Sequence, residues 1–318
     1  MEGKNMKRSL MIAAMAALAL SSLTPASYAQ DKNSAHQFIR IPRDPVTGAM
    51  AGAGAASSFT TAYSSFRNPA VIPFSDRTVD VGASFQMWAP DGVKSNNVAA
   101  GVGYKAGEKF GFSVGFAYDM GAGMDTYDAS GKSTGTFSPS EMVLNAGLGF
   151  AFTDKLGAGV NVRYSSDKVA DGVSTSAFGA DAFVLYKALP ELNITAGVSS
   201  LGSSVKDASG ESFSLPMSAT LAGAYAAAID ERNGLDIAVD ADYFFTGGIT
   251  AALGLQYSYD DMVFVRAGYH LGTDKAPLPS FATVGAGFKY AGFSLNVAYL
   301  TANNIIGNTL TFGLGVSF

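Results

Sequence analysis

The chain has 318 residues, of which only 15% are charged, well below the roughly one quarter that is typical of soluble globular proteins. It contains 37 Gly, 22 Phe and 14 Tyr but no Cys, which excludes disulfides, thiolate metal sites and cysteine nucleophiles. The net charge is −5 and the isoelectric point is near 5.0, so the composition gives no support for a nucleic-acid partner, which would favour a basic face.

The first thirty residues have the pattern of an exported protein. An apolar run, LMIAAMAALAL at residues 10–20, follows three basic residues, and small residues precede a cleavage position after Ala29. The run is shorter than the about 20 apolar residues that a membrane-spanning helix needs. We therefore expect residues 1–29 to be a signal peptide. No later segment offers an uninterrupted helical span, so any membrane insertion must be as a β-barrel.

Residues 30–77 differ from the rest of the chain in composition and in hydrophobic pattern. They contain four prolines and a cluster of Gly and Ala around Met50. These features argue against both a membrane-spanning strand and a free acidic linker. We predict that residues 30–77 form a structural unit of their own.

From residue 78 onward, apolar residues alternate with polar or small ones in about 14 segments, each roughly ten residues long and bounded by turn-forming residues. In GLDIAVDADYFF, for example, Leu235 and Ile237 share one face while Asp236 and Asp240 lie on the other. The polar faces carry small residues and few charges rather than the Lys, Glu and Thr of a solvated sheet. This favours a transmembrane antiparallel β-barrel over an exported soluble β-sandwich.

The connection lengths support the barrel independently. Connections after even-numbered segments have two to four residues, and those after odd-numbered segments are longer, except for TGG near Gly247. This parity is expected of a barrel in the outer membrane of a Gram-negative bacterium with both termini in the periplasm. A lumen of about 14 strands has room for an inserted segment, so we place residues 30–77 inside it.

Two pieces of residues 30–77, together with the barrel, resemble the FadL superfamily of outer-membrane barrels, and more closely its PorV/PorQ branch from type IX secretion. The first piece is FIRIPRDPVTGAMAGAG at residues 38–54, similar to the family's hydrophobic start, Pro-Asp turn and Gly-Met-Gly-rich stretch. The second is SSFRNPAVI, which matches the Asn-Pro-Ala of the family's N-terminal hatch. Here Arg67 stands where an aromatic residue commonly precedes the Asn. We call residues 30–77 the hatch.

The resemblance implies a non-enzymatic component of type IX protein secretion or cargo surface attachment. Its partners would be secreted cargo proteins or the secretion machinery, contacted through long loops such as residues 121–140 and 201–215. An alternative is a FadL-like channel for small hydrophobic molecules such as fatty acids, and a third is a porin-like structural protein. In each case outer-membrane lipid and the barrel-assembly machinery are expected partners, and no cofactor is expected.

Short motifs in the hatch can be interpreted as architecture. Asn68, Pro69 and Ala70 form a turn, since Asn tolerates turn geometry and Pro fixes φ, and they can also anchor the hatch in the lumen. The stretch around Met50 lacks the third Gly of a dinucleotide fingerprint and follows no strand. We therefore assign it to close packing of the hatch, with the participating residues Gly48, Met50, Gly52 and Gly54.

Three acids, Asp236, Asp240 and Asp242, share one face of a segment, where they could be paired acids or cation ligands. We predict a structural charge network in the lumen instead. The candidate cations are Arg163, Arg266 and Lys289 on the barrel and Arg40, Arg43 and Arg67 in the hatch.

The remaining candidates are few. His36 and His270 have no suitably spaced partners, so neither a His-based metal site nor a Ser-His-Asp triad is supported. The last segment, TLTFGLGVSF, is the predicted closing strand. Its terminal Phe resembles the C-terminal assembly signal of outer-membrane barrels, to which we assign Phe312 and Phe318.

Overall fold

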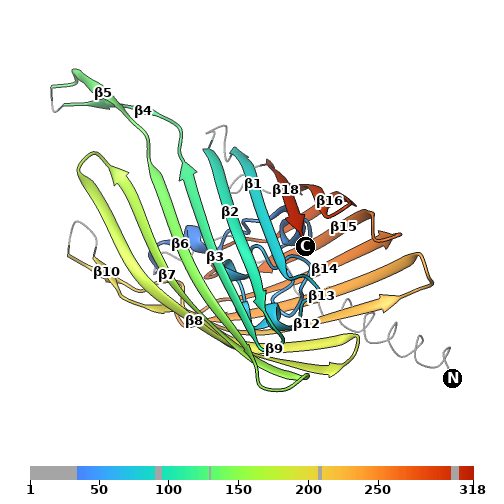
Figure 1. Ribbon diagram of the computed structural model, residues 1–318. Helices are drawn as coiled ribbons and strands as arrows, with labels where there is room; N and C mark the ends of the chain where they lie inside the picture. Colours follow the sequence, from blue (N-terminus) through green and yellow to red (C-terminus); the bar gives the residue numbers. More distant parts are fainter. Residues whose placement is uncertain (1–33, 90–94, 129, 207–209, 302–307) are drawn as a thin grey trace.

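The computed structural model describes residues 34–89, 95–128, 130–206, 210–301 and 308–318. The predicted signal peptide lies outside these residues. Within the described part, fourteen strands form one closed antiparallel barrel, which confirms the predicted fold class (Figure 1). In chain order they are β1 (Val79–Ala89), β2 (Ser95–Ala106), β3 (Phe110–Met120), β6 (Ser140–Ala151), β7 (Leu156–Ala170), β8 (Val173–Leu189), β9 (Leu192–Gly202), β12 (Ser218–Ala228), β13 (Asn233–Phe244), β14 (Ile249–Tyr259), β15 (Val263–Gly272), β16 (Phe281–Tyr290), β17 (Phe293–Thr301) and β18 (Asn308–Ser317).

The barrel closes between its first and last strands. β1 and β18 pair antiparallel without a register shift. The pairing reaches the last residue, because the amide of Thr78 donates to the carbonyl of Phe318 at 2.7 Å and the amide of Phe318 donates to the carbonyl of Val79 at 2.8 Å. Closure leaves no unpaired strand edge.

The two faces of the wall have opposite character. On β3, Phe110, Phe112 and Phe116 point outward and are exposed, while Gly111 and Ser113 between them are buried in the lumen. Most exposed large apolar side chains lie on this outward face of the strands. Such a band is stable only against lipid, so the barrel spans a bilayer. Among the described residues, no helix is long and apolar enough to cross a membrane.

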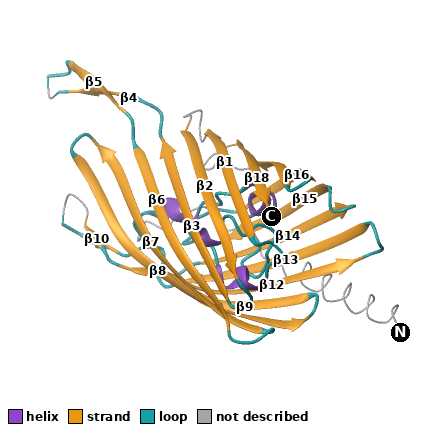
Figure 2. Cartoon of the chain, viewed as in Figure 1, coloured by secondary structure: helices purple, strands orange, loops and turns teal. Residues whose placement is uncertain are grey.

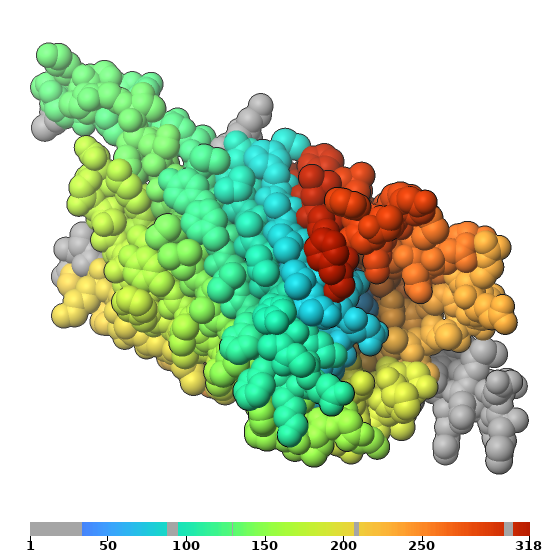
Figure 3. All heavy atoms as spheres, in the orientation of Figure 1, coloured from blue at the N-terminus to red at the C-terminus, as the bar shows by residue number. Residues whose placement is uncertain are grey.

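The two ends of the barrel differ. One end, which we call the turn end, carries the C-terminus and connections of two to four residues. The other, the loop end, carries the longer connections together with two short ones, at 171–172 and 245–248. Small hairpins form within two loop-end connections (Figure 2): β4 (Met124–Tyr127) with β5 (Ser133–Phe137), and β10 (Val205–Lys206) with β11 (Ser212–Phe213). The β4–β5 hairpin stands clear of the barrel in Figure 3.

One of the longer connections that the sequence predicts, SDKVADGVST at residues 166–175, is largely strand. β7 and β8 continue through it to a two-residue connection at 171–172. Their polar residues keep pairing, for example Asp167 with Thr175. Exposed β-ladders tolerate polar residues on both faces, which removes the apolar alternation from which strands are recognised.

The described part of the hatch occupies the lumen. It contains η1 (Gln37–Arg40), α2 (Pro45–Ala49), η2 (Ser64–Phe66) and η3 (Pro69–Phe74). Two of these start with the same device: Pro follows a capping side chain that accepts a backbone N–H bond. Asp44 accepts from Thr47 at 2.8 Å at the start of α2, and Asn68 accepts from Ala70 at 3.0 Å at the start of η3.

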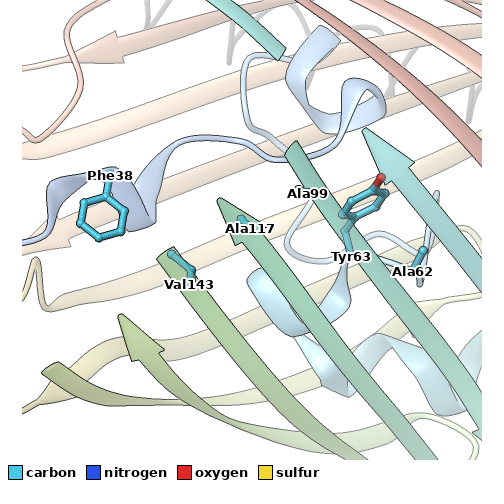
Figure 4. Packing of buried hydrophobic residues seen from close by; sticks show 6 residues of the cluster. All are labelled: Phe38, Ala62, Tyr63, Ala99, Ala117 and Val143. Carbon is cyan, nitrogen blue, oxygen red and sulfur yellow. The ribbon is translucent and has the colours of Figure 1, made fainter. Parts of the chain in front are cut away.

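Inward-facing glycines allow the hatch to touch the wall directly. A Cβ built on Gly101 would lie 2.1 Å from the carbonyl oxygen of Ala62, and one on Gly149 would lie 2.2 Å from that of Pro69. Apolar packing adds to these contacts, as Figure 4 shows for Tyr63 of the hatch and wall alanines of β2 and β3. Similarly close approaches occur at Gly82, Gly103, Gly111, Gly115, Gly147, Gly157, Gly159, Gly254, Gly268, Gly285 and Gly313.

Candidate functional site

The hatch divides the lumen into three spaces. A loop-side cavity of about 110 Å³ lies on one side and a turn-side cavity of about 670 Å³ on the other. Between them is a central cavity of about 10 Å³, which is close to the room that one water molecule needs. The lumen is therefore nearly blocked at the hatch and hollow at both sides of it.

The loop-side cavity combines apolar surface with arginines that are already paired, while the carboxylate of Asp44 accepts from the amide and hydroxyl of Thr47. Its apolar lining comes from both hatch and barrel: Ile39, Ile41, Phe66, Phe183, Phe244 and Leu278. Arg40 pairs with Asp242 and Arg67 with Asp240, each at 2.9 Å.

Two further ion pairs hold the other two arginines that line this cavity. Arg43 of the hatch pairs with Asp119 of β3 at 2.8 Å, and Arg163 of β7 pairs with Asp181 of β8 at 2.9 Å. All four partners are buried. A buried ion pair stays ionised only while both partners remain, so these charges are not free to bind a charged ligand.

The predicted lumen network is divided between hatch and barrel partners. Asp240 and Asp242 meet hatch arginines, and Asp240 also accepts the amides of Gly54 at 3.0 Å and Ala55 at 2.9 Å. Asp236 accepts from the side-chain amide of Gln256 at 2.7 Å.

The barrel cations named from the sequence lie elsewhere in the lumen. Arg163 binds Asp181, while Arg266 donates to the side-chain oxygens of Gln256 at 2.6 Å and Asn296 at 2.9 Å. Lys289 is half-buried and lines the turn-side cavity. The structure therefore brings none of these three cations to Asp240 or Asp242, because the hatch arginines already occupy that position.

The hatch motif residue Asn68 connects the hatch to itself and to the wall. Its amide nitrogen donates to the carbonyl of Ala55 at 2.9 Å and to the hydroxyl of Thr195 on β9 at 3.1 Å. Pro69 and Ala70 follow it in η3, where they pack on the wall glycines of β6 and β7.

The packing residues around Met50 lie at the opposite wall. Met50 is fully buried against Gly254 and Gly268, and a Cβ on Gly48 would lie 3.8 Å from that of Ala298. Gly52 and Gly54 have φ of +87° and +134°, which other residues rarely adopt.

At the end of the chain, Phe312 faces outward on β18 and Phe318 is 75% exposed. Their role in assembly stays a prediction.

Several residues that hold the lumen together were not singled out from the sequence. Asp80 accepts the amide of Thr61 at 2.7 Å and pairs with Arg77 at 3.1 Å. Asp119 and Asp181 were also missed. Each is a single acid at an inward position of an alternating strand, and that position was the available signal.

The hydrogen bonds of His36 with the barrel wall were also not predicted from the sequence. Its two ring nitrogens lie 2.8 Å from the hydroxyl of Ser165 and 2.9 Å from that of Thr175. Burial lowers the pKa of His36 to about 4, so the ring is neutral near pH 7. Within the described residues no group of three or more His, Cys, Asp or Glu is arranged to hold a metal ion.

Comparison with known proteins identifies the fold. No family model and no curated protein matches the sequence. Among solved structures, the toluene transporter TbuX of Ralstonia pickettii aligns with a TM-score of 0.64 at 12% identity, over 86% of this chain and 98% of that one. The toluene transporter TodX of Pseudomonas putida aligns with a TM-score of 0.58 at 15% identity, over 92% and 99%.

A FadL homologue of Pseudomonas aeruginosa aligns with a TM-score of 0.54 at 13% identity, over 88% of this chain and 99% of that one. The chain has a FadL-type barrel fold. With its apolar outward face, this FadL-type barrel is an outer-membrane β-barrel. The finer resemblance to the PorV/PorQ branch stays a prediction.

Proposed function

We propose that this FadL-type barrel is a non-enzymatic conduit that carries small, neutral, hydrophobic molecules across the outer membrane. The observation that carries the proposal is the loop-side cavity, whose four arginines are all held in ion pairs and whose remaining lining residues are mostly apolar. A neutral ligand would leave these ion pairs intact, whereas a charged one would bring an uncompensated ion into a buried site.

The size of the cavity favours a compact ligand. Its volume is about 110 Å³, while an apolar protein cavity of about 150 Å³ is known to bind benzene. A single-ring hydrocarbon therefore needs only small side-chain movements, and a long-chain fatty acid does not fit. Two of the similar structures are toluene transporters, which supports the same ligand class.

The secretion role implied by the PorV/PorQ resemblance receives less support. The fold likeness is to transporters. The loop regions proposed for partner contacts do contain the β4–β5 hairpin, which stands clear of the barrel, and the β10–β11 hairpin, which packs against β8 through Val205. Binding of cargo, of secretion machinery and of the barrel-assembly machinery stays a prediction. A pull-down from detergent-solubilised outer membrane tests it, and capture of secreted cargo without bound hydrophobic ligand would contradict the conduit.

Ligand binding tests the conduit directly. Calorimetric titration of the purified barrel in detergent should show saturable binding of toluene and none of hexadecanoic acid. Leu278→Glu places an unpaired charge at the loop-side cavity and should abolish toluene binding. Val169→Glu, at an exposed position of β7 outside the cavity, is the matched control and should bind normally. Equal toluene binding by both variants would contradict the proposed site.

A further inference from the structure

We propose that the turn-side cavity contains an anion-binding site, at which Arg266 and Lys289 bind the carboxylate of a small organic acid. Both residues face the lumen, from β15 and β16, and both line this cavity. The site lies on the other side of the hatch from the loop-side cavity. The inference therefore goes beyond the proposed function and does not depend on it.

Arg266 differs from every other arginine in the described residues. Each of the others pairs with an aspartate at 3.1 Å or less. Arg266 is only 4% exposed, yet it donates to neutral side-chain oxygens, from Nε to Gln256 at 2.6 Å and from Nη1 to Asn296 at 2.9 Å. Buried arginines are normally paired, so this guanidinium is suited to receive an anion from outside the chain.

The acids near Arg266 do not neutralise it directly. Gln256 stands between Arg266 and Asp236, because its side-chain amide donates to the Asp236 carboxylate at 2.7 Å. Asp261 also lines the cavity but forms no ion pair with Arg266 or Lys289 in the described part of the chain. A guanidinium has five N–H donors, and Gln256 holds this one in place while leaving its Nη2 donors available.

Lys289 supplies a second cation on the same patch of wall. The Arg266 side chain extends across β16, where a Cβ on Gly287 would lie 2.7 Å from Nη1. Lys289 follows two residues later on the same face of β16, which is about 7 Å along the strand. It is half-buried, and none of the ion pairs in the described residues involves it. Its flexible side chain can therefore reach a ligand oxygen that Arg266 also binds.

The surroundings of the two cations favour an organic acid. Apolar surface lies beside the guanidinium, since the Phe264 ring centroid is 5.1 Å from its Cζ. Pro45 of the hatch lies against Gly313, which pairs with Asn296 across β17 and β18. A carboxylate can bind the cations while a compact apolar body packs on these rings. The cavity of about 670 Å³ has room for such a molecule.

Calorimetric titration of the purified barrel in detergent with benzoate, which is ionised at neutral pH, tests the site. We expect saturable binding of benzoate and none of benzamide, the neutral amide of similar shape, because benzamide lacks the charge that the two cations bind. An equal concentration of inorganic phosphate should not displace benzoate. Displacement by phosphate would show a site for any small anion and would overturn the assignment to an organic acid.

Two variants and a control locate the site. Lys289→Gln and Arg266→Gln should each weaken benzoate binding about ten-fold, since each removes a charged hydrogen bond. Lys187→Gln makes the same charge change in the same cavity, but Lys187 lies elsewhere, over the Phe74 ring, and this control should bind benzoate normally. Heat-modifiable gel mobility shows which variants fold. Unchanged binding by folded Lys289→Gln would overturn the proposal even where Arg266→Gln does not fold.

A loop-side variant separates this site from the proposed conduit. Leu278→Glu alters the loop-side cavity and should leave benzoate binding unchanged. Benzoate binding that depends on Lys289 but not on Leu278 would support the turn-side site whether or not the barrel binds toluene. Loss of benzoate binding in folded Leu278→Glu would place the acid in the loop-side cavity and would overturn the proposal.

Discussion

At the scale of residues, Asp240 of β13 binds the hatch to the barrel wall through several contacts at once. Its buried carboxylate pairs with Arg67 at 2.9 Å and accepts hydrogen bonds from two backbone amides of the hatch. Asp240→Ala leaves these donors without an acceptor, and loss of one partner of a buried pair costs about 3 kcal/mol. We expect urea unfolding in detergent to show this loss of unfolding free energy.

The control for this prediction removes both charges. Asp240→Leu combined with Arg67→Met should recover a large part of the loss, since it leaves no unpaired ion. Equal destabilisation by the single and the double variant would show that the ion pair is not what Asp240 contributes.

His36 makes the loop end of the hatch sensitive to acid. Its pKa is about 4 in the fold and about 6.5 in an unfolded chain. Between these values the unfolded chain binds more protons, so the free energy of unfolding should fall by up to about 3 kcal/mol as the pH drops from 6.5 to 4, and should not depend on His36 above 6.5.

Comparison with His36→Gln isolates this contribution. Gln has no proton to gain, so the pH dependence of urea unfolding should be flatter below pH 6.5 in the variant. Parallel pH profiles of the two proteins would mean that the acid sensitivity arises at another group.

At the scale of elements, the fit between hatch and strands depends on missing side chains. Gly101→Ala places a methyl group 2.1 Å from the carbonyl oxygen of Ala62, and such overpacking costs about 1–3 kcal/mol. Gly223→Ala is the matched control, because its nearest neighbour, the carbonyl oxygen of Asn193, is 3.8 Å away. We expect lower urea resistance and faster proteolysis of the hatch in the first variant only.

Strands were predictable and the hatch fold was not. The period-two alternation of each strand fixes which side chains face lipid, and this pattern is local. The hatch has no such period: its shape comes from contacts such as Asn68 with Thr195 and Arg67 with Asp240, 127 and 173 residues apart. Sequence therefore suggested that lumen acids pair with cations but could not choose between Arg67 and Arg163 as the partner.

For the whole molecule, strand number and connection parity were enough to predict a closed barrel. The three cavities were beyond prediction, because their volumes depend on how the hatch side chains meet the wall. Closure itself involves the last residue, since Phe318 exchanges backbone hydrogen bonds with the start of β1.

Deletion of Phe318 should therefore impair membrane assembly. It removes three backbone hydrogen bonds at the closing strand pair and the terminal aromatic residue. The amount of heat-modifiable barrel in the outer membrane should fall, while the barrels that do assemble should still bind toluene. Normal assembly of the truncated chain would contradict this role.

The central claim is that this FadL-type barrel conducts small hydrophobic molecules. A comparison of toluene uptake rates between intact cells with and without the protein tests this claim most directly. Cells that express the protein should take up toluene faster than cells with an empty vector, and Leu278→Glu should return the rate to the vector level while Val169→Glu should not. Equal rates in cells with and without the folded wild-type barrel would contradict the account.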